Sequence, residues 1–101
     1  MVTEEQVREA LRSVKDPELG LNLVDLGLVY RIQVLPDGVV EADITLTALG
    51  CPAAPAIVAQ AKEAIEQLEG VKEARVHLVW NPPWKPKMMS ERAKRALGFL
   101  R

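Results

Sequence analysis

The residue of this 101-residue chain with the clearest chemical potential is Cys51, its single cysteine. It stands between Gly50 and Pro52, after a β-branched run and before apolar residues at helical spacing. Glycine permits a sharp turn, and proline suits the opening of a helix. Free N–H groups and the helix dipole favour an anion there, so the sequence predicts a Cys51 thiolate, the form that attacks electrophiles or binds metal. The alternative is a buried cysteine that packs as a small hydrophobic residue.

Two acidic residues around a proline, Asp16 and Glu18, form the second candidate. Pro17 restricts the backbone on both sides, so we expect an extended stretch with a partly fixed geometry between the two carboxylates. Such a pair can bind a hard metal ion, orient a thiol or transfer a proton. The alternative is a loop of solvated acids that ends a helix.

His77 is a lone histidine on the polar side of a predicted strand, and we expect it to be a surface residue. The sequence contains no serine–histidine–aspartate order, no glycine-rich phosphate loop and no second cysteine at metal-binding spacing. An ordinary enzyme is therefore not expected.

The first element that must position these residues is an N-terminal helix. Thr3 and Gln6 form a predicted capping box, in which each side chain accepts a backbone N–H of the other. Pro17 disfavours helical backbone at Asp16, so the helix is expected to run to about Lys15.

Alternating apolar residues predict strands over residues 26–34, 40–47 and 75–80, the first two joined by a Pro-Asp-Gly turn. A second helix is expected after the Gly-Cys-Pro turn, and Gly70 is expected to stop it. Its first regular turn should begin near Pro55, because in a helix opening earlier this proline would fall where a hydrogen bond is needed.

The C-terminal part is expected to be less regular. Trp80 continues an apolar strand face and is predicted to lie in the core, whereas Trp84 is predicted to be a lid over the core or a contact for a partner. Residues 81–86 contain three prolines and should run extended. Ser90 should then cap a short helix that Gly98 ends.

The element order is thus α-β-β-α-β, and each strand is apolar on one side. This pattern predicts an α+β fold, a two-layer sandwich in which two helices cover one face of a small sheet. The first two strands should pair antiparallel, and the third should pair parallel with one of them through a right-handed crossover. Residues 1–101 are expected to form a single domain.

Composition bounds the class of protein. Hydrophobic residues make up 49% and charged residues 27%, as in an ordinary soluble globule. No apolar run approaches the roughly 20 residues of a membrane span, and one cysteine cannot form an internal disulfide. We therefore expect a cytoplasmic protein that does not contact membranes.

The net charge of −1 hides an uneven distribution. Residues 85–101 carry a net charge of +5 and residues 1–84 a net charge of −6. A basic tail can contact nucleic acid or an acidic surface, but more often it folds back on its own acidic body. No aromatic and basic pattern on the sheet supports nucleic-acid binding.

Several longer motifs resemble a known family. Residues 14–18 read Val-Lys-Asp-Pro-Glu, residues 22–30 read Asn-Leu-Val-Asp-Leu-Gly-Leu-Val-Tyr, residues 45–47 read Thr-Leu-Thr before Gly-Cys-Pro at 50–52, and residues 80–84 read Trp-Asn-Pro-Pro-Trp before Met-Ser at 89–90. Together and in this order they resemble the SufT/PaaD family of metal–sulfur cluster biosynthesis factors, which includes the cytosolic iron–sulfur assembly targeting proteins. The resemblance covers nearly the whole chain.

The resemblance implies a domain of the iron–sulfur cluster assembly type, whose members help to mature or deliver clusters to client apoproteins together with other assembly proteins. The cysteine of the Gly-Cys-Pro turn is then the reactive residue, and a metal-binding one. Carried over by motif, Asp16, Glu18, Thr47 and Cys51 would gather at one end of the sheet. The phenylacetate-oxygenase branch has further cysteines near its C-terminus; this chain has none, which favours the general assembly branch.

Iron–sulfur clusters usually have four thiolate ligands, and this chain offers one. Three readings stay open: a homodimer in which two Cys51 thiolates hold a cluster, a cluster shared transiently with a client or a small thiol, or a docking adaptor without metal. A further alternative is an enzyme with Cys51 as nucleophile, supported by Asp16 or Glu18 and by His77.

Overall fold

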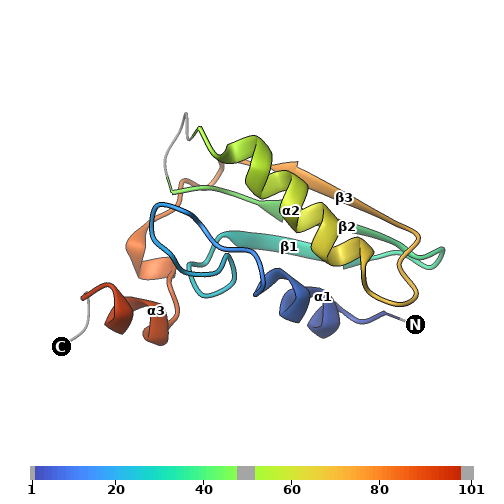
Figure 1. Cartoon of the computed structure of the whole chain (residues 1–101), viewed down its shortest axis with the longest axis horizontal. Coiled ribbons are helices and arrows are strands. Elements are labelled where there is room, and N and C mark those ends of the chain that lie inside the picture. Colours follow the sequence, from blue (N-terminus) through green and yellow to red (C-terminus); the bar gives the residue numbers. More distant parts are fainter. Residues whose placement is uncertain (1, 48–51, 99–101) are drawn as a thin grey trace.

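A three-stranded mixed sheet with helices on one side organises the molecule (Figure 1). The computed structural model describes residues 2–47 and 52–98. The elements in chain order are α1 (Glu4–Leu11), β1 (Val29–Val34), β2 (Val39–Ile44), α2 (Ala54–Glu66), β3 (Glu73–Leu78), the 3-10 turn η1 (Pro86–Met88) and α3 (Glu91–Ala96). Central β2 pairs antiparallel with β1 and parallel with β3. The predicted α+β fold and both predicted strand pairings are confirmed.

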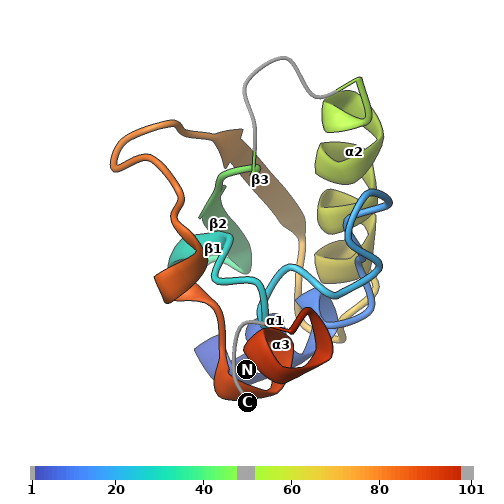
Figure 2. The same cartoon turned by 90° about the vertical axis from the view of Figure 1, so that its left-hand side faces the viewer.

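The core lies between the sheet and the two longer helices. α2 packs on β3, and α1 packs against both α2 and β1. Figure 2 shows α2 forming a layer on one side of the sheet, while the chain after β3 leaves on the other side. The inward row of β2 and the apolar stripe of α2 are buried, as the spacing predicts: Val40, Ala42 and Ile44 in the strand, and Ile57, Ala61 and Ile65 in the helix.

The helix boundaries follow local capping chemistry. Thr3 and Gln6 form the predicted capping box, and the Ser90 hydroxyl accepts the backbone N–H of Ala93 at the start of α3. α2 begins at Ala54 with Pro55 as its second residue, so the expectation that its first regular turn lies near Pro55 is confirmed. Within residues 2–47 and 52–98, no helix has the length and apolar character needed to cross a membrane.

The predicted end of α1 is wrong, because the helix stops at Leu11 rather than near Lys15. Backbone pairing with a later segment takes over there. The Leu23 N–H donates to the Val14 carbonyl at 3.0 Å, and Lys15 forms an isolated antiparallel bridge with Asn22. Val14 is 2% exposed, so leaving the helix brings this side chain into the core.

The first strand also starts later than predicted, at Val29 instead of residue 26. Gly27 adopts a φ of +76°, and its N–H donates to the Val24 carbonyl, so residues 23–27 form a turn. A bulge between Val29 and Arg31 then takes Tyr30 out of the predicted apolar row. The Tyr30 hydroxyl instead donates to the Pro82 carbonyl at 2.8 Å.

The prediction that Trp80 lies in the core is wrong, since this side chain is 37% exposed. β2 ends at Ile44, and the Val79 N–H still donates to the Ile44 carbonyl at 2.8 Å, but the strand pairing of β3 with β2 stops at Leu78, before Trp80. Trp84 packs on the core, and its Nε1–H donates to the Leu26 carbonyl at 2.6 Å, which confirms the predicted lid. The prediction that residues 81–86 run extended is wrong at the end of this range, because Pro86 begins the 3-10 turn η1.

Candidate functional site

The described segments that carry or adjoin the sequence-predicted site residues are the loop of residues 16–20, the end of β2 and the start of α2. In Figure 1 these three segments lie toward the same end of the sheet. Thr47 is half-buried after β2, and Pro52 is exposed before α2. The expectations for Gly50 and Cys51 fall outside the described residues.

Asp16 is the buried member of the predicted site, at 1% exposure. Its Oδ1 accepts the backbone N–H groups of Glu18 and Leu19 at 2.8 and 3.3 Å. The prediction of an extended Asp-Pro-Glu stretch is therefore wrong: residues 17–19 form a turn, which these side-chain hydrogen bonds stabilise. Glu18 is exposed, so the turn separates a buried carboxylate from one that faces solvent.

Two buried side-chain oxygens among the described residues have no hydrogen-bond partner, Asp16 Oδ2 and Thr45 Oγ1. A buried polar atom without a partner carries a desolvation cost of roughly 1–3 kcal/mol, so such atoms are rare in folded proteins. Sequence alternation places Thr45 in the outward polar row of its strand. Nothing in that spacing shows that it is fully buried.

His77 is not one of these buried polar residues. It lies exposed on β3, in register with Asp43 of β2, which confirms the predicted surface position. Over residues 2–47 and 52–98, no three histidine, cysteine or acidic residues are placed to hold a metal ion.

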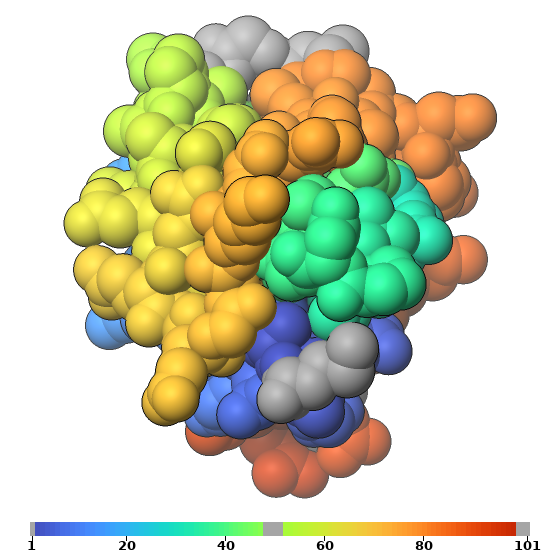
Figure 3. Space-filling model, turned by 90° about the vertical axis from the view of Figure 1, so that its right-hand side faces the viewer, coloured from blue at the N-terminus to red at the C-terminus, as the bar shows by residue number. Residues whose placement is uncertain are grey.

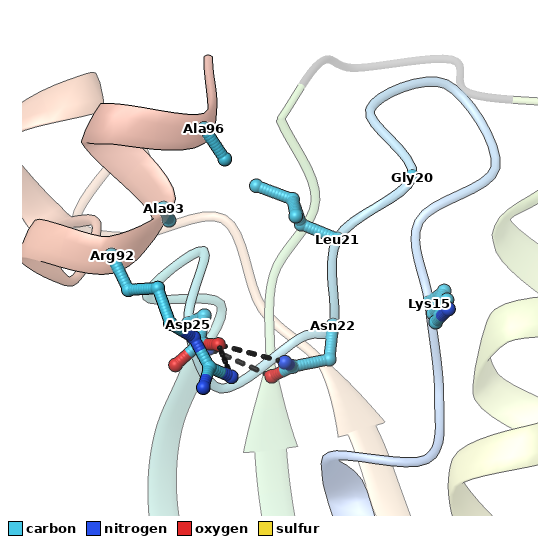
Figure 4. Close-up of a pocket in the computed structure, with 8 residues that line it drawn as sticks. All are labelled: Lys15, Gly20, Leu21, Asn22, Asp25, Arg92, Ala93 and Ala96. Atoms are coloured by element: carbon cyan, nitrogen blue, oxygen red, sulfur yellow. Dashed lines mark hydrogen bonds and ion pairs between the residues drawn. The ribbon is translucent and has the colours of Figure 1, made fainter. Parts of the chain in front are cut away.

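A second polar cluster, which sequence reasoning missed, centres on Asp25 (Figure 4). Arg12 Nη1 lies 2.9 Å from Asp25 Oδ1, while Arg92 Nη2 and Asn22 Nδ2 lie 2.7 and 2.9 Å from Oδ2. The Ser90 N–H donates to the Asp25 carbonyl at 2.7 Å. The cluster therefore joins the end of α1, the following loop and α3 beside a pocket of about 210 Å³.

Arg92 also shows where part of the basic tail goes. Its contact with Asp25 confirms, for this residue, the expectation that the tail folds back on the acidic body. The uneven charge of the two parts of the chain was the available signal, but charge alone could not identify Asp25 as the partner.

The Asp25 cluster makes stability depend on pH. Burial alone would raise the pKa of Asp25, but hydrogen bonds from Arg92, Asn22 and Arg12 outweigh it and hold this pKa below its ordinary value of 3.8. The charged carboxylate therefore stabilises the fold above pH 3.8, and this contribution is lost as the pH falls through the lower folded-state pKa.

We expect Asp25→Asn to lower the free energy of unfolding near neutral pH by about 1 kcal/mol. The effect is limited to this size because solvent screens the interaction of Asp25 with Arg92 and Arg12. The difference from wild type should shrink as denaturation is measured at pH values progressively below 3.8. Glu91→Gln is the matched control, since Glu91 is exposed and its Oε2 lies 3.9 Å from Arg95. A difference for Asp25→Asn that stays constant down to the lowest pH would contradict the argument.

Fold and site together describe a small α+β domain with a three-stranded mixed sheet, a buried Asp16 turn and an ion-paired Asp25 cluster. Residues 4–78 match the family model described as iron–sulfur cluster assembly protein, and the chain belongs to this family.

Particular relatives extend the match to almost the whole chain. The chain is 50% identical to the Fe-S protein maturation auxiliary factor YitW of Bacillus subtilis, over 94% of this chain and 93% of the relative. It is 47% identical to the Fe-S protein maturation auxiliary factor SufT of Staphylococcus aureus, over 84% and 97%. The crystal structure of a domain of unknown function, DUF59, from Bacillus anthracis superposes with a TM-score of 0.91 at 40% identity, covering 97% of this chain and 92% of that one.

Proposed function

We propose that this chain is an accessory factor in iron–sulfur cluster assembly, which binds a cluster or iron transiently through Cys51 and delivers it to client apoproteins. The observation that carries the proposal is similarity over nearly the full length to proteins named as Fe-S protein maturation auxiliary factors. Such a factor works with other assembly proteins and with clients, and it assists their maturation without catalysing a reaction of its own.

Cys51 supplies the proposed ligand, a thiolate. A cluster usually needs four thiolates, and one chain provides one, so the cargo must be shared with a second copy, a small thiol or the client. Incomplete ligation suits a carrier, because the cargo has to leave.

Asp16 has a proposed supporting role. Its Oδ2 is buried without a hydrogen-bond partner among the described residues, while Oδ1 holds the 17–19 turn in place. An oxygen in this state gains from an added donor or cation, so the loop is suited to organising a polar site at this end of the sheet. Glu18 on the same loop and Thr47 after β2 complete the proposed set, and we propose that Gly50 and Pro52 shape the turn that carries Cys51.

Anaerobic reconstitution with iron and sulfide tests the proposal. The wild type should develop visible sulfur-to-iron charge-transfer absorption, Cys51→Ala should lose it, and Asp16→Asn should retain less of it. Glu63→Gln, which changes an exposed carboxylate on α2, is the control and should behave as wild type. A mass shift to a dimer with the absorption would identify two Cys51 thiolates as shared ligands.

Absorption that survives Cys51→Ala would overturn the thiolate role. No absorption in any of the proteins would also contradict cluster binding and would leave a docking adaptor, for which client apoproteins would then be sought as direct binding partners.

A further inference from the structure

The part of the molecule that the proposed site does not use is the segment that follows β3, residues 80–87. Trp80 is the one large hydrophobic side chain that stands exposed in the described structure. Around it, Asn81, the prolines at 82, 83 and 86, and the lysines at 85 and 87 are exposed as well. The match to the family model ends at residue 78, before this segment begins.

This segment is held in shape by contacts with the body of the protein. The Pro82 carbonyl accepts the Tyr30 hydroxyl at 2.8 Å, and the Trp84 Nε1–H donates to the Leu26 carbonyl at 2.6 Å. Each proline also fixes its own φ angle. A segment fixed in this way loses little conformational entropy when a partner binds, which favours affinity.

The segment is positively charged, and its two lysines are not neutralised by carboxylates of the described residues. No acidic residue occurs between residues 79 and 90. Neither Lys85 nor Lys87 forms an ion pair with any described residue, whereas Arg31, Arg75 and Arg92 are all paired with carboxylates. The two ammonium groups are therefore free to pair with carboxylates of another molecule.

A partner bound to residues 80–87 would lie at the end of the sheet where the cluster-binding site is predicted. The segment leaves the end of β3 at the same end of the sheet as the exit from β2 and the start of α2 (Figures 1 and 2). In Figure 3, the orange residues around and after the end of β3 project past the strands on one side. An exposed tryptophan on a projecting, preorganised surface is the kind of residue that contributes most to protein–protein affinity.

We propose that residues 80–87 form a docking surface for an acidic segment of a partner protein. An apolar side chain of that segment packs on Trp80, and carboxylates of the same segment pair with Lys85 and Lys87. The inference goes beyond the proposed function, since it concerns residues other than Cys51 and requires no metal.

A displayed library of random peptides of about twelve residues, selected on the wild-type chain without iron, tests this docking surface. Enriched peptides should carry aspartate or glutamate around an apolar residue. Their binding is then measured by fluorescence anisotropy, with Lys85→Glu combined with Lys87→Glu expected to weaken it at least about tenfold, and Trp80→Ala about fivefold. Added salt should weaken it as well.

Two variants serve as controls. Lys72→Glu changes an exposed lysine before β3 that also has no ion-pair partner among the described residues, and it should leave binding unchanged. Cys51→Ala should also bind as wild type, so failure of docking and failure of the thiolate role are separate results. The melting temperature of Trp80→Ala should equal that of the wild type, because the side chain it removes is outside the core.

Three results would overturn the proposal. The first is a selection that enriches no peptide, or enriches neutral or basic ones. The second is equal weakening by Lys72→Glu. The third is self-association of the wild type that the charge reversal at Lys85 and Lys87 abolishes, which would make the acidic body of a second copy the occupant instead.

Discussion

Replacing Gly27 by alanine is expected to lower the free energy of unfolding by about 3 kcal/mol. A Cβ at this position would lie 2.2 Å from the carbonyl oxygen of Met88 and 2.8 Å from its carbonyl carbon, both backbone atoms that cannot rotate away. The φ of +76° adds strain for any residue with a side chain. Met88 would have to move, and with it the neighbouring buried Met89. Chemical denaturation of variant and wild type measures the loss.

Gly20→Ala separates the two contributions. Gly20 has a similar φ of +73°, but nothing lies within 4 Å of a Cβ built there. This control should cost about 1 kcal/mol, from backbone strain alone. If Gly27→Ala were no more destabilising than Gly20→Ala, the close approach of the Met88 backbone would not be a feature of the folded protein in solution.

Replacing Cys51 by serine is expected to abolish support of client maturation in cells, because a hydroxyl at neutral pH supplies no thiolate for iron. In a strain that depends on this chain for an iron–sulfur enzyme, the activity of that enzyme should fall to the level seen when the chain is absent. Enzyme activity per amount of enzyme protein is the measurement, and thermal melting of the purified variant establishes that it is folded.

The control for this experiment is Glu63→Gln, expressed from the same plasmid, which should restore client activity fully. Full activity with Cys51→Ser would remove the thiolate from the proposed mechanism. Client binding by a surface such as residues 80–87 would then be the role left to test.

The sequence predicted the fold best where one periodicity runs without interruption. The spacing of Ile57, Ala61 and Ile65 was enough to place α2 and its buried face, but the helix ends at Glu66 and not at Gly70 as predicted. Predictions failed where contacts between distant residues replace the local pattern. The end of α1 depends on pairing of Val14 with Leu23, and nothing in the helical spacing before Pro17 reveals it.

The candidate site was predictable in part. The Asp-Pro-Glu stretch was identified by residue type, but only the structure shows that Asp16 is buried in a turn. Asp25 and Arg92 are 67 positions apart, so no motif could join them. Trp80 was misplaced because alternation continues past the residue where β2 ends, and a strand without a partner has no reason to stay in the sheet.

The mixed pairing of the sheet also sets an order of assembly. β1 and β2 meet across a short turn, whereas Val39 of β2 faces Glu73 of β3, 34 positions further along the chain. Closing the longer loop costs more entropy, so we expect the hairpin to form first and to act as a template. Once α2 folds, its 13 residues span only about 20 Å, which brings β3 back within reach of β2. The stretch that contains Cys51 thus connects an early-forming hairpin to a layer that assembles on it later.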